Sequence, residues 1–258
     1  MLYDTHLHTE ISDDSTVLIA DYVQQARTLG IGITPTEHLD YDHPHNHGSV
    51  PDLAKYFHEY SKYRGKGCYL GIEVGMQLQT AESSRQLIEQ YDFDHLLCSF
   101  HILDRKDLIG NSLYLQPKAE VYRKYFQRMF DNLESHSYMT ELGHIDYISR
   151  GFCAKYPDPE IYYEQFVPEI DAVLQWLADN DKAIEINTRR FPDKTAIQSL
   201  IAILKRFAAL GGKLCTLGSD SHAVAALGGH FDLAYKLALD CKLQPVYFVE
   251  RRPVEMER

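Results

Sequence analysis

Cysteine is scarce in this sequence, and the cysteines that occur are far apart. Only five are found among 258 residues, and no two of them form a CxxC pair. An odd number of scattered cysteines argues against a disulfide framework and against a zinc site built from cysteine thiolates. We therefore expect reduced, mostly buried thiols at these positions, which are Cys68, Cys98, Cys153, Cys215 and Cys241.

Basic residues are also few. The chain has 26 Lys and Arg against 37 Asp and Glu, which gives a formal net charge of −11. Nucleic acids and anionic membrane surfaces select a basic face, so we expect neither as a partner. A small anionic substrate remains compatible with this charge, because the local charge of a cleft can oppose the charge of the whole chain.

Long apolar runs are missing as well. No run in the sequence approaches the roughly 18 residues that cross a bilayer. No basic segment followed by an apolar core stands at the first residues. These features predict a cytoplasmic protein. The sequence does not indicate its oligomeric state.

Short apolar runs typical of strands alternate along the chain with longer segments of helical periodicity. This alternation favours a parallel α/β sheet, either open or closed into a barrel. No repeat or linker interrupts it, so we expect one domain over residues 1–258. The expected strands are 2–8, 32–37, 68–75, 94–100, 138–143, 183–188, 213–219 and 245–250. The expected helices lie near 16–29, 52–63, 82–91, 117–135, 161–180, 195–210 and 230–242.

Histidine, in contrast, is abundant, with 13 in the chain. Many histidines and several carboxylates fall at or just past the carboxyl ends of the expected strands, where the active sites of α/β proteins assemble. They are His6, His8, His38, Glu73, His101, His144, Asp220 and His222. Residues two apart on a strand point to one side, so His6 and His8 can chelate together.

Each of these residues also has a plain structural interpretation. A single histidine at a strand end is more often an ordinary polar residue than a ligand, and an HxH pair can arise by chance. Glu73, however, stands in an otherwise apolar run, and if it is buried it must be paired or bound to a metal. The repetition at one sheet edge favours a multinuclear metal site, and imidazole with carboxylate ligands suits Zn, Mn or Fe rather than Ca.

Six short motifs together resemble those of the PHP (polymerase and histidinol phosphatase) superfamily. They are HLH at 6–8, TEH at 36–38, GIE at 71–73, SFH at 99–101, GHID at 143–146 and SDSH at 219–222. The resemblance covers nearly the whole chain. It is nearest to the stand-alone histidinol-phosphate phosphatases, because no polymerase domain follows and EINT at 185–188 is also similar to that branch. It implies a distorted seven-stranded (β/α)7 barrel of the TIM type, with the metal site at the C-terminal ends of the strands.

The resemblance also implies three divalent metal ions and their ligands. The first ion would be held by His6, His8, Glu73 and Asp220. Glu73 would bridge to a second ion, which His101 and His144 complete. The third would be held by His38, His222 and an aspartate of the ISDDS segment, with Asp14 favoured by spacing and Asp13 as the alternative. Glu73, Asp220 and His222 are the expected catalytic residues within this set.

The activity that the resemblance implies is hydrolysis of a small phosphomonoester. Three divalent ions, three carboxylates and one hydroxide would give the site a net charge of about +2, which complements a phosphate dianion. Water activated by the metals would attack phosphorus. L-Histidinol phosphate is the leading candidate substrate, and its hydrolysis is a step of histidine synthesis. Alternatives are a PHP phosphoesterase for another small phosphate ester or a nucleotide, an amidohydrolase-type C–N hydrolase, and an inactive metal-binding module.

Two groups of residues have weaker sequence signals. Arg150, Arg189 and Arg190 follow predicted site strands and are candidates for the phosphate, because a guanidinium group binds it in a bidentate manner. The loop YDHPHNHG holds His43, His45 and His47 and is a second possible metal tract or a cover over the site. The general acid for the leaving group is not indicated by the sequence.

Overall fold

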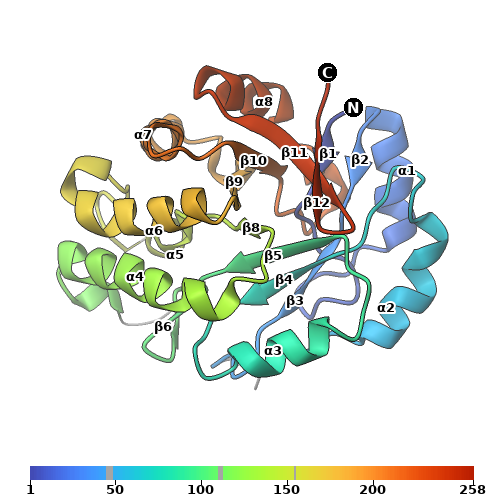
Figure 1. Ribbon diagram of the computed structural model, residues 1–258, viewed down its shortest axis with the longest axis horizontal. Coiled ribbons are helices and arrows are strands. Elements are labelled where there is room, and N and C mark those ends of the chain that lie inside the picture. Colours follow the sequence, from blue (N-terminus) through green and yellow to red (C-terminus); the bar gives the residue numbers. More distant parts are fainter. Residues whose placement is uncertain (45–48, 110–112, 154) are drawn as a thin grey trace.

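A central, mostly parallel sheet is the main feature of the computed structural model, which describes residues 1–44, 49–109, 113–153 and 155–258 (Figure 1). Its strands follow the order β12-β11-β10-β9-β8-β5-β4-β3, and every neighbouring pair is parallel except β11 with β12. The bounds are β3 (Thr36–Leu39), β4 (Gly71–Gly75), β5 (His95–Ser99), β8 (Glu141–Leu142), β9 (Ala183–Asn187), β10 (Leu214–Gly218), β11 (Gln244–Val249) and β12 (Arg252–Glu255).

Two short pairs accompany this sheet. Strand β1 (Tyr3–Asp4) is parallel to β2 (Gly32–Ile33), and β6 (Ile102–Leu103) forms a hairpin with β7 (Lys106–Asp107). The predicted strand 32–37 is therefore two strands, because Thr34 and Pro35 separate β2 from β3. All eight expected strands correspond to strands of the structure, whereas β6, β7 and β12 were not predicted.

The chain beyond β1 lies between the two ends of this arrangement. Thr5 N–H donates to Leu217 O over 2.9 Å, and Thr36 N–H donates to Leu7 O, also over 2.9 Å. Residues 5–8 thus contact the end of β10 on one side and the start of β3 on the other. Across the described ranges, the strand pairing itself is that of an open sheet, with β12 and β3 at its edges.

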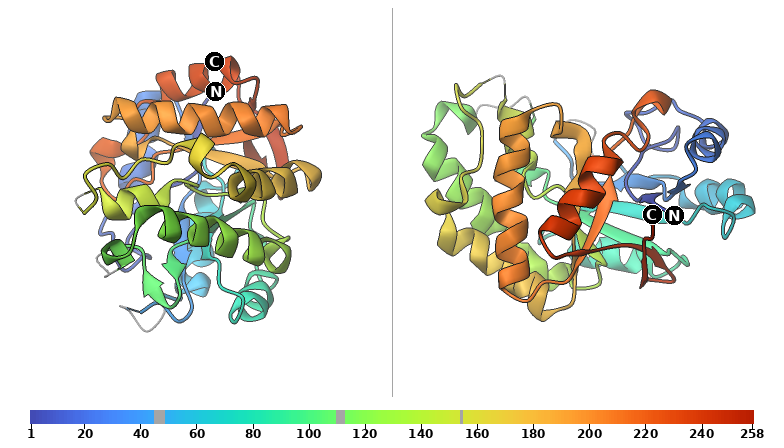
Figure 2. Two further views of the ribbon diagram at one scale, coloured as in Figure 1. Left: turned by 90° about the vertical axis from the view of Figure 1, so that its left-hand side faces the viewer. Right: turned by 90° about the horizontal axis from the view of Figure 1, so that it is seen from above.

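Helices pack around the sheet and account for all the helical predictions (Figure 2). They are α1 (Ile19–Leu29), α2 (Leu53–Tyr60), α3 (Ala81–Ile88), α4 (Lys118–Leu133), α5 (Tyr147–Phe152), α6 (Val167–Asp179), α7 (Lys194–Ala209) and α8 (Phe231–Asp240). Helix α7 shows why these segments fold as they do, because its buried residues recur at steps of three and four and form one apolar face. Helix α1 ends at Gly30, which has a φ of +67° that glycine adopts without strain.

One continuous hydrophobic core runs from Leu2 to Met256. The two ends of the chain lie side by side (Figures 1 and 2), and the Met1 ammonium group donates to Glu257 O. No helix in the described part of the chain is long and apolar enough to pass through a membrane.

Candidate metal centre

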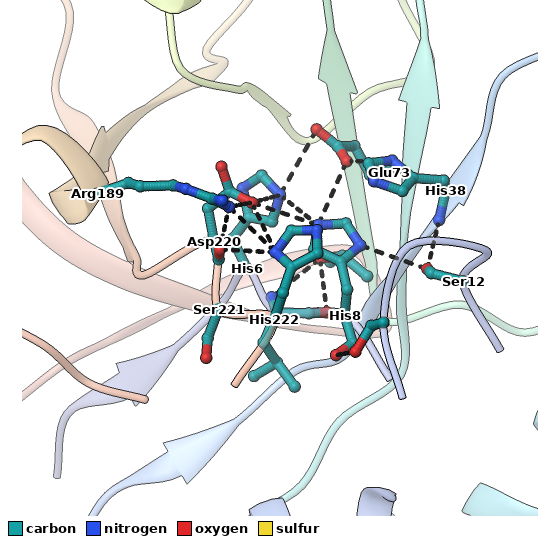
Figure 3. Close-up of polar contacts among 12 residues, drawn as sticks. His6, His8, Ser12, His38, Glu73, Arg189, Asp220, Ser221 and His222 are labelled. Atoms are coloured by element: carbon teal, nitrogen blue, oxygen red, sulfur yellow. Dashed lines mark hydrogen bonds and ion pairs between the residues drawn. The ribbon is translucent and has the colours of Figure 1, made fainter. Parts of the chain in front are cut away.

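The predicted site residues meet at the carboxyl edge of the parallel strands. His38 lies in β3 and Glu73 in β4, while His101 follows β5 by two residues. His144 follows β8, and Asp220 and His222 follow β10. Figure 3 shows the imidazoles of His6, His8 and His222 between Glu73 on one side and Asp220 on the other.

Glu73 is the centre of this group, and its side chain is fully buried. Its Oε1 lies 3.1 Å from His144 Nε2, 3.2 Å from His101 Nε2 and 3.5 Å from His6 Nε2. Three imidazoles from three different strand ends therefore converge on one carboxylate oxygen.

The second oxygen of Glu73 faces another pair of imidazoles. Its Oε2 lies 2.8 Å from His38 Nδ1 and 3.6 Å from His8 Nε2. Although burial alone would raise the pKa of Glu73, the surrounding imidazoles, with His6 and His101 foremost, hold it well below its usual range. Glu73 is thus a carboxylate shared between two sets of ring nitrogens.

Asp220 and Asp14 complete the group at its other side. Asp220 Oδ1 lies 3.6 Å from His8 Nε2 and 3.9 Å from His6 Nε2. Asp14 Oδ2 lies 2.9 Å from His222 Nε2 and 3.3 Å from His38 Nε2. Of the two aspartates that the sequence left open, Asp14 is the one that makes these contacts.

The donor atoms fit divalent cations. Four sets of side chains each bring their nitrogen and oxygen atoms within 4.8 Å of one another: His6, His8 and Asp220; His6, Glu73 and His144; His38, Asp40 and His101; and His8, Asp14, His38 and His222. Glu73 Oε2 and His38 Nδ1 are buried and lie 2.8 Å apart, but this contact does not have the geometry of a hydrogen bond. A cation bound between the imidazoles and the carboxylate would satisfy both atoms. Imidazole and carboxylate donors suit Zn, Mn or Fe.

The protonation of the histidines supports this interpretation. Burial, with the neighbouring His38 imidazole, lowers the pKa of His8 to about 3, so His8 is in the neutral form that binds a metal. Burial opposes the charge of His6 as well, but Glu185 and Glu73 raise its pKa well above the usual value. Metal binding would therefore displace protons from this centre.

Three supporting residues were not predicted. Glu185 in β9 lies 2.7 Å from His6 Nδ1 through its Oε1, and Asp40 Oδ1 lies 3.2 Å from His101 Nδ1. Ser12 Oγ accepts a hydrogen bond from His38 N–H over 3.2 Å and contacts His8, as the dashed lines in Figure 3 show. Two of these had a sequence signal: Asp40 lies two residues after His38, and Glu185 is a lone carboxylate in an apolar strand, as Glu73 is.

The three candidate arginines occupy two different places. Arg189 Nη1 donates to Asp220 O over 2.8 Å and to Asp220 Oδ1 over 3.2 Å, and Arg150 in α5 donates to Asp220 Oδ2. Arg190 donates instead to Asp146 Oδ2 over 2.8 Å and to Glu160 Oε1. Arg150 and Arg189 therefore border the metal centre, whereas Arg190 binds two carboxylates beside it.

Two cavities border the centre. One of about 410 Å³ is lined by residues that include Arg189, Asp220 and His222. The other, of about 180 Å³, is lined by residues that include Asp14 and His43. His45 and His47, the other histidines of the possible metal tract, lie outside the described residues.

A comparison with protein families shows the family of this chain. The family model described as "PHP domain" matches residues 4–189, and this chain belongs to that family. A probable histidinol-phosphatase of Clostridium acetobutylicum is 42% identical over 252 residues, which are 97% of this chain and 98% of that protein. The histidinol-phosphatase of Lactococcus lactis is 33% identical over 227 residues, 85% of this chain and 83% of that protein.

Solved structures show the same fold. The histidinol phosphate phosphatase of Lactococcus lactis, in a crystal structure with zinc, L-histidinol and phosphate, superposes with a TM-score of 0.91 at 29% identity over 98% of this chain and 99% of that one. A putative histidinol phosphatase of Listeria monocytogenes superposes with a TM-score of 0.73 at 16% identity over 90% of this chain and 99% of that one, a likeness of fold alone.

Proposed function

We propose that this protein is a metal-dependent phosphatase that hydrolyses L-histidinol phosphate to L-histidinol and phosphate, a step of histidine synthesis. The observation that carries this proposal is the buried carboxylate of Glu73 with five imidazoles around it. The relatives named histidinol-phosphatase, and the Lactococcus lactis structure with zinc, L-histidinol and phosphate, support the substrate.

We propose three metal positions with Glu73 as the bridge between two of them. The ligands are those that the family resemblance implies: His6, His8, Asp14, His38, Glu73, His101, His144, Asp220 and His222. The contacts of Asp14 with His38 and His222 favour it over Asp13 as the oxygen ligand of the third ion. Zinc is the metal that the Lactococcus lactis structure suggests, and manganese and iron fit the same donors.

Bound ions would activate water and neutralise charge on the phosphoryl oxygens. The protein side chains supply the rest. Arg150 and Arg189 are both held by Asp220 at the edge of the centre, from which their guanidinium groups would bind and orient the phosphate. Arg190, fixed by Asp146 and Glu160, would support the loop that carries Arg189 rather than contact the phosphate.

Three further features belong to this proposal. We infer that residues 5–8 close the sheet into a distorted barrel of the PHP type, because they contact both β10 and β3. We infer one domain over residues 1–258, because the core extends from Leu2 to Met256. We also place the protein in the cytoplasm, where its unpaired cysteines stay reduced.

A metal analysis and a substrate panel test the proposal. Protein purified without chelator should retain two to three ions per chain, and one or none would contradict the three-ion centre. Phosphate release should then be compared for L-histidinol phosphate, simple sugar phosphates, a nucleotide and a dinucleotide. If another compound gives the highest kcat/KM, the substrate is wrong and the chain is a PHP phosphatase of different specificity.

A further inference from the structure

Asp4 is a buried carboxylate at the end of β1, two residues before His6. Its Oδ1 accepts a hydrogen bond from Ser219 N–H over 3.0 Å, and its Oδ2 accepts one from Gly228 N–H over 2.9 Å. One side chain therefore holds both ends of the segment 219–228, which carries Asp220 and His222.

The chain has an irregular strand pairing where this segment begins. Thr5 N–H donates to Leu217 O, and His8 N–H donates to Ser221 O. The step between these two hydrogen bonds is three residues in the N-terminal segment but four residues in the segment after Leu217. The extra residue forms a bulge, and Asp220 within it has a φ of +51°. A bulge leaves a main-chain amide without its ladder partner. At Ser219 the Asp4 carboxylate takes the place of that partner.

The far end of the segment is held just as closely. Gly228 has a φ of +63°, and a Cβ atom there would lie 2.8 Å from Ile31 Cδ1. The main chain thus passes tightly over the region that follows α1, with its amide directed at Asp4. Both oxygens of the carboxylate are used, one for each end of the segment, and Oδ1 also accepts a longer hydrogen bond of 3.4 Å from the main-chain N–H of His6.

We propose that Asp4 is a positioning residue for the metal centre, which fixes Asp220 and His222 in the arrangement that binds a divalent cation by holding both ends of the segment 219–228. This inference rests on the proposed function. An Asn side chain has one acceptor oxygen, and its amide would turn N–H groups toward one of the two main-chain donors. Asp4→Asn should therefore release one end of the segment.

Asp94 provides a control at the amino end of β5, the end of that strand opposite to the metal centre. It is equally buried and also accepts two main-chain N–H groups, those of Leu70 and Glu250, each over 2.9 Å. Asp94→Asn removes the same charge and disturbs main-chain hydrogen bonds of the same kind, and it also weakens the ion pair between Asp94 and Arg64, in which Oδ1 and Nη2 are 2.7 Å apart. It therefore perturbs the stability of the fold without touching Asp220 or His222. The two variants separate a local effect on the centre from a general loss of stability.

The experiment titrates zinc into the metal-free full chain against a chromophoric chelator, for the wild type and both variants. We expect the affinity of Asp4→Asn for zinc to fall about tenfold or more, with kcat close to that of the wild type once zinc is saturating. Amide hydrogen exchange should become faster within 219–228 in Asp4→Asn only. Asp94→Asn should keep wild-type zinc affinity.

Wild-type zinc affinity in Asp4→Asn, or an equal loss in Asp94→Asn, would overturn this inference alone. A wild-type chain that binds no zinc would overturn the proposed function and the inference with it. If Asp4→Asn does not fold, Gly228→Ala tests the same tether with the carboxylate intact, because an alanine is strained at a φ of +63° and its Cβ would also lie 2.8 Å from the end of the Ile31 side chain. Unchanged zinc affinity in a folded Gly228→Ala protein would then contradict the role of Asp4.

Discussion

Glu185 and His6 form a buried pair in which Oε1 and Nδ1 are 2.7 Å apart. The other oxygen of Glu185 accepts a hydrogen bond of 2.5 Å from His144 N–H. One carboxylate therefore orients an imidazole from the first strand and anchors the main chain that carries a second imidazole. Loss of a side chain that orients metal ligands in this way typically lowers metal affinity or activity about 10–100-fold.

This relationship predicts the effect of Glu185→Gln. The amide can still accept from one partner, but its N–H group would face the second donor, so either the orientation of His6 or the main-chain anchor of His144 is lost. We expect kcat/KM for L-histidinol phosphate to fall about 10–100-fold, with partial recovery in excess metal. Steady-state kinetics at several zinc concentrations measure this effect, and unchanged kcat/KM would show that Glu185 does not position the ligands.

Glu73→Ala should have a larger effect, because the side chain itself would be the shared ligand. We expect the chain to lose at least one ion and kcat to fall more than the roughly 100-fold expected for a residue that only orients a ligand. The fold should persist, because the variant removes a buried charge and leaves the apolar strand around it. Metal analysis and circular dichroism provide the measurement. Near-wild-type turnover would rule out the bridging role.

The arginines should divide into two classes. Arg150→Ala removes a guanidinium group beside Asp220, and we expect KM to rise about tenfold or more, as for loss of a charge-assisted hydrogen bond. Arg190→Ala leaves the buried carboxylates of Asp146 and Glu160 without their partner. We expect its free energy of unfolding to fall by about 3–5 kcal/mol.

Urea denaturation and substrate titration of both variants distinguish these effects. The KM of Arg190→Ala should stay within about twofold of the wild type, since loss of an interaction with the bound phosphate would cost tenfold or more. A large rise in KM for Arg190→Ala with unchanged stability would assign that arginine to the phosphate instead.

Thiol reactivity should distinguish Cys153 from the other four cysteines. Cys153 is exposed, whereas the others are buried, and burial raises the pKa of Cys68 to about 12 and also raises that of Cys241. Because the thiolate is the reactive form, one thiol per chain should react with a disulfide reagent at pH 8, and five should react in denaturant. Cys153→Ser should abolish the reaction of the folded protein; rapid reaction of a second thiol would contradict this assignment.

The sequence predicted the main strands because they follow local rules, and the proposed ligands came from the motifs that resemble the PHP superfamily. Alternation along a strand places His6 and His8 on one side, and their Nε2 atoms are 3.1 Å apart. Asp40 and Glu185 were not predicted, although Asp40 follows His38 by two residues and Glu185 is a lone carboxylate in an apolar strand. Their partners, His101 and His6, come from distant strands, so no local pattern identified their roles.

Other features depend on contacts that a sequence pattern does not contain. Strand β12 is four residues long and contains Pro253, which lacks a main-chain donor and weakens a strand pattern. It forms only because β11 lies antiparallel to it. The helix α5, with six residues, is too short for a clear helical period. The bulge at Asp220 arises from pairing with residues near the start of the chain.

The hydrogen bond between Ser219 and Asp4 joins residues that are 215 positions apart in the sequence. During synthesis the first strand therefore leaves the ribosome long before the segment that pairs with it exists, and contacts so distant in sequence form slowly. Until residues 217–228 emerge, His6 and His8 lack Asp220 and His222. We therefore expect the metal ions to bind late in synthesis, after most of the other strands and helices have been made.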